Sequence, residues 1–202
     1  MYIATDSKEI KEVCESFTKN IILTKSTHQS GTDRVGEAVA TLDCDVVINV
    51  QGDEPFIDPV LVEELINLFK NKETTMASAM SRIDNLEDLQ NTNVVKVVTD
   101  HQKNALYFSR SPIPFPRDHK EMALSDQGLK RYPFFRHIGI YGYRRDFLLD
   151  YVKMHQSTLE KIEKLEQLRV LENGYTIKML EAASDSTGID TMEDYQDALK
   201  KY

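Results

Sequence analysis

The chain has 202 residues, of which 41% are hydrophobic, and its formal net charge is -8 at pH 7. This length is typical of one globular domain, residues 1–202, with a sizeable core. Nonspecific nucleic-acid binding needs clustered Lys and Arg, so we expect no nucleic-acid partner for so acidic a chain. No apolar run approaches the roughly 20 residues that span a bilayer, and the N-terminus lacks a signal-peptide pattern. We therefore expect no membrane partner. The two cysteines, Cys14 and Cys44, fit a reducing compartment better than a disulfide framework, so we expect a cytoplasmic protein.

The first part of the chain alternates strand and helix patterns. After a short N-terminal strand, Asp6 or Ser7 is expected to cap a helix that runs to about residue 17. The further expected elements are a strand at 20–24, a polar loop at 28–34, a helix at 35–42, and strands at 44–50 and 74–83 separated by a helix at 58–71. Such alternation is typical of βαβ units, whose mainly parallel sheet is covered on both faces.

The pattern changes from residue 94 onwards. Residues 94–115 indicate two strands joined by a short polar turn, which predicts a mixed sheet. The remaining expected elements are a loop at 112–133, a strand at 135–143, a helix at 157–174, a strand at 176–182 and a closing helix at 188–202.

Two acids stand where predicted strands or their loops turn into helices. Asp53 ends the apolar run VVINVQGD, and Asp190 follows Gly188. The carboxyl ends of strands form the ligand crevice of open α/β sheets, so the two acids could converge there. Carboxylates at such an edge suit Mg²⁺ with substrate phosphates. A solvated turn at Asp53 and a helix cap at Asp190 are the alternative interpretations.

Other polar residues are weaker signals by themselves. In HQSGTDR, residues 30–32 would let a ligand approach the backbone and Arg34 could reach an anion, but a simple turn has the same composition. His137 could be a core histidine, Arg110 a salt-bridged arginine, and Glu166 half of a helix pair. The spacing matches neither a Walker loop nor a dinucleotide fingerprint, and no catalytic triad or zinc-ligand pattern is present.

Seven motifs occur along the chain in one order: HQSGTDR, VINVQGDEP, VVKVV, ALYFSR, RHIGIYGY, LEKIEKLEQLRVLENG and GIDT. In this order the chain resembles the 3-deoxy-manno-octulosonate (Kdo) cytidylyltransferases of lipopolysaccharide biosynthesis over nearly all of its length. The resemblance implies a three-layer α/β/α, nucleotide-diphospho-sugar transferase-like (Rossmann-like) fold with a mixed, mainly parallel sheet. It further implies attack of the anomeric hydroxyl of Kdo on the α-phosphate of CTP, with release of pyrophosphate and with Mg²⁺ as cofactor.

The resemblance also implies roles for individual residues. Asp53 and Asp190 are expected to be catalytic and to bind Mg²⁺. The expected nucleotide-binding residues are His28, Ser30, Gly31, Asp33 and Arg34, and the expected sugar-binding residues are Gln51, Arg110, His137, Tyr141, Glu166 and Gln167. A homodimer is implied as well, and the alternating segment FRHIGIYGYRR could pair or pack across its subunits.

One departure from the family pattern concerns the front of the chain. Family members begin with a strand and a basic loop of the form PARxxSxRLPGKPL, whereas MYIATDS here matches their second strand. The resemblance implies that about 45 residues of the family pattern are absent from the front, including the first strand of the sheet and the loop with the main triphosphate-binding arginine and lysine. A noncatalytic sugar-binding or dimerising remnant is therefore an alternative, as is another sugar-acid cytidylyltransferase or a metal-dependent glycosyltransferase.

Overall fold

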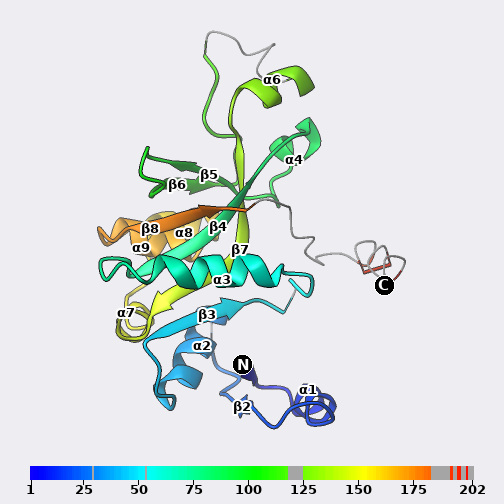
Figure 1. Ribbon diagram of the computed structural model, residues 1–202, viewed down its shortest axis with the longest axis vertical. Helices are drawn as coiled ribbons and strands as arrows, with labels where there is room; N and C mark the ends of the chain where they lie inside the picture. The colour runs from blue at the N-terminus through cyan, green and yellow to red at the C-terminus, as the bar shows by residue number, and fades with distance from the viewer. Residues whose placement is uncertain are drawn as a thin grey trace.

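A computed structural model describes residues 1–28, 30–52, 54–117 and 125–182, together with positions 192, 195, 196 and 199. In this part of the chain the strands form a two-stranded sheet and a six-stranded sheet. Figure 1 shows the larger sheet at the centre of the molecule and the small sheet below it, beside the N-terminus.

The small sheet pairs two short parallel strands, β1 (Ile3–Thr5) and β2 (Ile21–Leu23). Helix α1 (Lys8–Cys14) connects them, and it begins where Ser7 Oγ accepts a hydrogen bond from the backbone N–H of Ile10 at 3.2 Å. The expected cap at Ser7 is thus confirmed, although the helix ends earlier than expected. Nothing in α1 is buried, and its apolar side chains Ile10 and Val13 are at least half exposed.

Strand β7 (Phe135–Arg144) is the centre of the six-stranded sheet. Along one side it pairs with β4 (Met76–Arg82). On its other side it pairs with two strands in succession, β5 (Lys96–Thr99) near its beginning and β3 (Val46–Val50) near its end. The outer strands are β6 (Ala105–Ser109) beside β5 and β8 (Ile177–Glu181) beside β4.

The sheet is mixed, as expected, but most neighbouring strands in the described part are antiparallel. Among the described strands, only β1–β2 and β4–β8 are parallel pairs. Strand β7 runs against β3, β4 and β5, so it separates strands that share one direction. Strands β3, β4, β5 and β8 all run in one direction, as a mainly parallel sheet requires. Most adjacent strands are nevertheless antiparallel, because β7 lies between them.

The central position of β7 also corrects one expectation about assembly. Its backbone is bonded to β4 on one side and to β3 or β5 on the other, and Ile138, Ile140, Tyr141 and Tyr143 are buried. A strand with neighbours on both sides has no free edge for another subunit. The idea that FRHIGIYGYRR pairs across subunits is therefore wrong.

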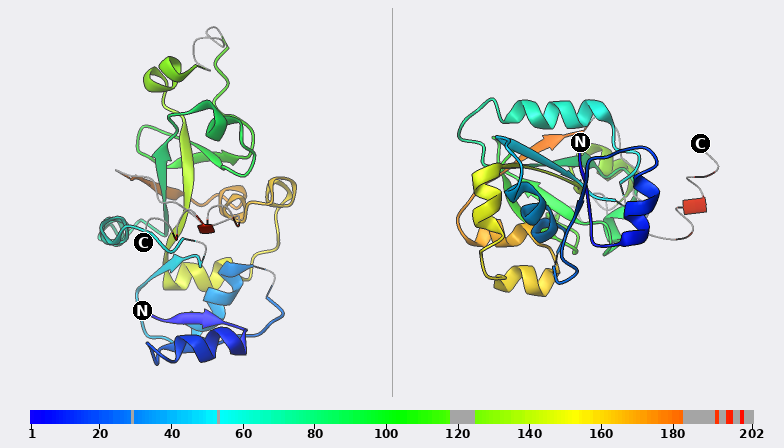
Figure 2. Two further views of the ribbon diagram at one scale, coloured as in Figure 1. Left: turned by 90° about the vertical axis from the view of Figure 1, so that its right-hand side faces the viewer. Right: turned by 90° about the horizontal axis from the view of Figure 1, so that it is seen from below.

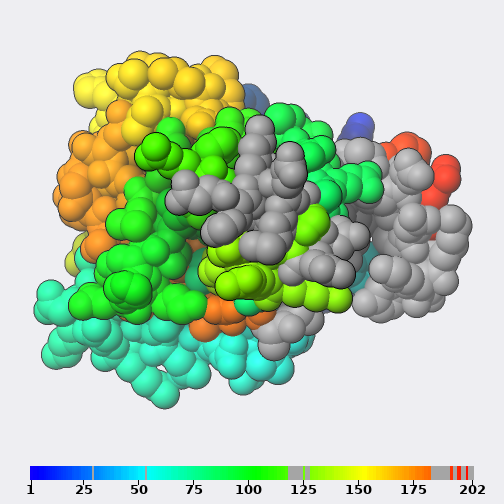
Figure 3. All heavy atoms as spheres, turned by 90° about the horizontal axis from the view of Figure 1, so that it is seen from above, coloured from blue at the N-terminus to red at the C-terminus, as the bar shows by residue number. Residues whose placement is uncertain are grey.

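Helices cover both faces of the six-stranded sheet (Figure 2). Helix α3 (Pro59–Leu68) packs on one face, where its Leu61 and Leu65 meet Ala77 and Ile140. The helices of the opposite face are α2 (Gly31–Ala40), α7 (Arg145–Tyr151), α8 (Thr158–Glu163) and α9 (Gln167–Glu172). In Figure 3 the gold and orange α8–α9 region and the cyan α3 lie on opposite sides of the green β5–β6 region.

Several helix boundaries differ from the sequence expectation. Helix α2 begins at Gly31 rather than at residue 35, because Ser30 Oγ caps it by accepting from the N–H of Asp33 at 3.1 Å. The helix expected at 157–174 is divided into α8 and α9, because Lys164 adopts a left-handed conformation with φ 57°. Short helices not foreseen are α4 (Leu86–Gln90), α6 (Asp126–Arg131, within the expected loop) and α7.

The helix expected at 188–202 lies almost wholly outside the described residues. None of the described helices combines the length and the apolarity that crossing a bilayer requires.

Candidate functional site

The sheet divides at the middle of β7. The β3 pairing ends at Val50 opposite Ile140, and the β5 side resumes where the N–H of His137 donates to the carbonyl of Val95 at 2.8 Å. The register with β4 also shifts here, since Ser78 pairs with Tyr141 and Ala79 with Ile138. The carboxyl end of β3 therefore opens at a split in the sheet, which is the kind of place where α/β proteins bind ligands.

His137 lies at this split. Its Nε2 is 2.8 Å from Ser78 Oγ, and its ring centroid is 5.2 Å from those of Phe108 and Tyr141. Burial lowers the pKa of His137 to about 3, because the charged imidazolium would lose its hydration. His137 is therefore a neutral hydrogen-bonding group at physiological pH.

Tyr141 and Gln167 meet beside His137. The hydroxyl of Tyr141 donates to Gln167 Oε1 at 3.4 Å, and the two residues are 8% and 3% exposed. Asn49 on β3 is paired in register with Tyr141, so both side chains lie on the same face of the sheet. The structure thus brings two predicted sugar-binding residues together and adds Asn49 to them.

Arg110 follows the end of β6 on the same side of the sheet. Its Nε donates to the carbonyl of Glu163 at 2.8 Å, and one terminal nitrogen donates to the carbonyl of Thr92 at 2.9 Å. The Glu163 carboxylate also accepts from the backbone N–H of Arg110 at 3.0 Å. Arg110 and His137 are separated by two strand spacings, about 10 Å. The guanidinium is therefore held at the rim of the split rather than in a simple salt bridge.

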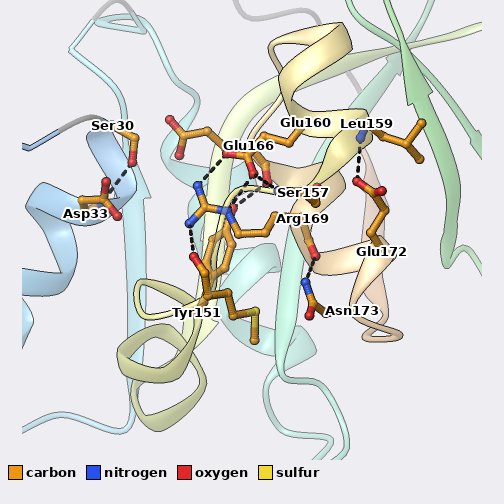
Figure 4. Close-up of polar contacts among 11 residues, drawn as sticks. Ser30, Asp33, Tyr151, Ser157, Leu159, Glu160, Glu166, Arg169, Glu172 and Asn173 are labelled. Atoms are coloured by element: carbon orange, nitrogen blue, oxygen red, sulfur yellow. Dashed lines mark hydrogen bonds and ion pairs between the residues drawn. The ribbon is translucent and has the colours of Figure 1, made fainter.

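Glu166 connects the two predicted groups of site residues. It precedes α9, and Figure 4 shows it opposite Ser30 and Asp33 of the α2 segment. Burial raises its pKa, while hydrogen bonds with the side chains of Thr32 and Ser30 act in the opposite direction. A sugar-side carboxylate therefore lies against the first turn of the predicted nucleotide-side helix.

A prediction about pH follows from Glu166. Because the folded protein binds its proton more tightly than the unfolded chain does, this residue makes the free energy of unfolding fall as the pH rises from the ordinary carboxyl pKa through the raised one. We expect Glu166→Gln to remove that decline and to be more stable than the unsubstituted protein above this range. Denaturant unfolding at pH values from about 4 to about 8 measures the effect.

Asp100 provides a control with the opposite sign. Hydrogen bonds from Asn104 lower the pKa of its carboxylate, so its contribution to stability is present at neutral pH and is lost as the pH falls through the lowered pKa. Asp100→Asn should lower stability at neutral pH. A Glu166→Gln profile that parallels that of the unsubstituted protein would contradict the assignment.

The nucleotide-side residues are anchored to the N-terminal unit. Arg34 donates to Thr24 Oγ1 at 2.7 Å and lies 3.1 Å from Asp6 Oδ1, so it ties α2 to the ends of β2 and β1. The imidazole of His28 is hydrogen-bonded to the carboxylate of Glu37, a residue of the same helix α2. A Cβ at Gly31 would meet nothing within 4 Å, which leaves the backbone at the start of α2 open to a ligand.

The expected metal ligands cannot be placed in the same way. Asp53 and Asp190 both lie outside the described residues, and Gln51, two positions before Asp53 in the sequence, is exposed at the end of β3. Within the described ranges no three His, Cys, Asp or Glu side chains gather in an arrangement suited to a metal ion. Gln51 itself follows the end of β3, beside the split.

Three further residues of the site escaped the sequence reasoning. The amide nitrogen of Asn49 is buried without a hydrogen-bond partner among the described residues. Thr32 is 6% exposed and contacts Glu166, and Ser78 is fully buried against His137. A polar residue inside an otherwise apolar strand pattern, as in VVINV and MASAM, was the available signal.

Comparisons with known proteins identify relatives of this chain. A family model described as cytidylyltransferase matches residues 1–179. Proteins called 3-deoxy-manno-octulosonate cytidylyltransferase are 45% identical in Geobacter metallireducens, over 98% of this chain and 79% of theirs, and 42% identical in Solibacter usitatus, over 96% and 74%. A solved structure of CMP:2-keto-3-deoxy-manno-octonic acid synthetase complexed with CTP is 35% identical, with a TM-score of 0.88, over 99% of this chain and 80% of that one.

A more distant structure supports the fold alone. A glucose-1-phosphate thymidylyltransferase structure from Bacillus anthracis has a TM-score of 0.60 at 14% identity. The fold is thus the nucleotide-diphospho-sugar transferase type of architecture, and the matched family model makes the chain a nucleotidyltransferase. Within that class, the chain belongs to the 3-deoxy-manno-octulosonate cytidylyltransferase family.

Proposed function

We propose that this protein transfers CMP from CTP to Kdo and releases pyrophosphate. The observation that carries the proposal is the contact of Glu166 with Ser30 and Thr32, because it joins the sugar-side and nucleotide-side residues in one site. A transferase needs its two substrates next to each other, since correct positioning supplies a large part of the rate. Family membership identifies the pair of substrates.

On the nucleotide side, the first turn of α2 would receive CTP. The backbone N–H groups at the start of a helix favour anionic ligands, and Gly31 leaves them accessible. Ser30 and Asp33 supply side-chain oxygens beside them, while Arg34 and His28 hold the loop in place through Asp6 and Glu37. In this proposal Arg34 orients the loop rather than binding phosphate directly.

On the sugar side, the groups suit an acid with many hydroxyls. Neutral His137, Tyr141 and Gln167 can exchange hydrogen bonds with hydroxyl groups, and Gln51 stands at the open end of β3. Arg110 is the cation available for the sugar carboxylate. The raised pKa of Glu166 fits a carboxyl group that binds a hydroxyl in a place of low polarity.

We place the Mg²⁺ ion of the reaction at Asp53 and Asp190. The end of β3 beside Gln51 is a suitable position, because Mg²⁺ is held by one or two carboxylates with waters and substrate phosphates rather than by a full protein cage. When bound, the ion would neutralise phosphate charge. The residues of this chain would position the sugar hydroxyl and the α-phosphate for attack.

The test is pyrophosphate release by the 202-residue chain supplied with CTP, Kdo and Mg²⁺. We expect release with Kdo and none with N-acetylneuraminate, another sugar acid. Release with N-acetylneuraminate alone would refute the choice of sugar. Kdo binding without release under any condition would instead favour a noncatalytic binding protein.

Two further features belong to the proposal. We expect the protein to act in the cytoplasm, which agrees with Cys14 and Cys44 being free thiols. We also expect a homodimer, on the family resemblance, with an interface that does not involve pairing through β7. Light scattering coupled to size exclusion measures the oligomeric state.

A further inference from the structure

Ser78 is a buried hydroxyl in the middle of β4. Its residue is fully buried, and its neighbours Met76 and Met80 are core residues of the same face. Its Oγ lies 2.7 Å from the carbonyl oxygen of Ile140, 3.5 Å from that of Ile138 and 2.8 Å from Nε2 of His137. Three polar atoms of β7 therefore surround one serine hydroxyl.

The number of protons decides the direction of these bonds. A serine hydroxyl has one hydrogen to donate, and a carbonyl oxygen can only accept. Two oxygens 2.7 Å apart need a proton between them, so the hydroxyl donates to Ile140. Its lone pairs then face His137, and the 2.8 Å contact requires that Nε2 carry a hydrogen.

We propose that Ser78 is a positioning residue that fixes His137 in the Nε2–H tautomer and so presents Nδ1 as a hydrogen-bond acceptor in the site. In a neutral imidazole one nitrogen donates and the other accepts, and the partner of one nitrogen determines the role of the other. Among the described residues, Nδ1 has no hydrogen-bond partner. Burial, which keeps the ring neutral, also keeps this lone pair available.

The register shift in the sheet explains why Ser78 can reach these atoms. Ser78 pairs with Tyr141 but Ala79 pairs with Ile138, so the intervening part of β7 leaves the regular ladder with β4. The carbonyl of Ile140 is consequently free to accept the serine hydroxyl. The hydroxyl thus stabilises the irregular backbone and orients the histidine at the same time.

The chemical consequence concerns the ligand and rests on the proposed function. A neutral ring with an unshared lone pair on Nδ1 accepts a hydrogen from a sugar hydroxyl, whereas it would repel the lone pairs of a carboxylate. His137 would therefore select a hydroxyl of Kdo, and the carboxylate would be left to Arg110. Losing the fixed tautomer would weaken sugar binding without removing any atom that touches the sugar.

Ser81 provides a matched control on the same strand. It is 3% exposed, and its hydroxyl has no hydrogen-bond partner among the described residues. Ser81→Ala removes the same atoms as Ser78→Ala but breaks no hydrogen bond. Ser78→Thr retains the hydroxyl and serves as the conservative variant.

The experiment makes two measurements on the unsubstituted full chain and on each of these three variants. Nitrogen NMR of the histidine rings reports the tautomer directly, and calorimetric titration with Kdo, with and without CTP, reports sugar binding. We expect the Nε2–H tautomer of His137 in the unsubstituted protein, Ser81→Ala and Ser78→Thr, and mixed tautomers in Ser78→Ala. Affinity for Kdo should fall about tenfold in Ser78→Ala only, with CTP affinity unchanged.

The outcomes separate this inference from the proposed function. An Nδ1–H or protonated ring in the unsubstituted protein overturns the inference, whether or not Ser78→Ala folds. A pure Nε2–H tautomer in folded Ser78→Ala, or Kdo affinity that does not change with the tautomer, overturns it too. Failure of the proposed function would appear instead as absent pyrophosphate release while CTP and Kdo still bind and the tautomer is as expected.

Discussion

Replacing Arg169 by Met is expected to lower the free energy of unfolding by about 3–5 kcal/mol, because it leaves Glu160 as an unpaired buried charge. The two side chains are only 6% and 5% exposed, and they form two parallel bonds of 2.5 and 2.8 Å. The guanidinium also lies 5.1 Å from the ring centre of Tyr151. Figure 4 shows the pair joining α8 to α9 on the face that carries the site.

Denaturant unfolding of the full chain measures this effect, and two controls define it. The double replacement of Glu160 by Leu and Arg169 by Met should recover much of the loss, since no charge remains buried. Lys153→Met breaks an exposed 3.0 Å pair with Asp150 and should cost about 0–1 kcal/mol. If Arg169→Met and Lys153→Met lowered the free energy of unfolding equally, the buried ion pair between α8 and α9 would not stabilise the fold as described.

Replacing Asp53 by Asn is expected to reduce the rate of pyrophosphate release at least about 100-fold, because a preorganised charge at the reacting phosphates would be lost. Asparagine has the size of aspartate but is a neutral ligand, so Mg²⁺ should be bound more weakly. The rate at saturating CTP and Kdo should therefore depend on much higher Mg²⁺ concentrations in the variant.

Asp45→Asn is the matched control for this prediction. Asp45 is exposed at the opposite end of β3, so the substitution changes a carboxylate far from the split. Its backbone carbonyl accepts from the N–H of Arg145, a bond that the substitution leaves in place. We expect unchanged activity and unchanged Mg²⁺ dependence. Equal losses in Asp45→Asn and Asp53→Asn would contradict a specific role for Asp53.

Local structure was predictable wherever one short-range signal dominated. The apolar run at 44–50 became β3, the Asp58-Pro59 start became α3, and the alternation of FRHIGIYGY became β7. In each case the side-chain period or a capping residue decides the conformation without help from distant residues. The helix start at Gly31 differs from the expectation: the polar composition of HQSGTDR favours a loop, but Ser30 acts as the N-cap of α2.

The break between α8 and α9 shows the limit of such signals. Lys, Glu, Leu and Gln in residues 157–174 all favour helix, and no Gly or Pro marks Lys164. Tertiary contacts override that preference, because the buried Glu160–Arg169 pair joins the two short helices across the break and the hydroxyl of Tyr151 donates to the carbonyl of Glu166.

The sequence alone determined the residue types of the proposed site, the order of most strands and helices, and the family. Only the folded chain determined that β7 lies between β4 on one side and β3 and β5 on the other, and that Ser78 meets His137 across 59 positions of sequence. The physical reason is that periodicity and capping act over a few residues, whereas strand order and register depend on how distant apolar faces are buried together. The chemistry of each side chain at the split therefore depends on neighbours that lie far away in the chain.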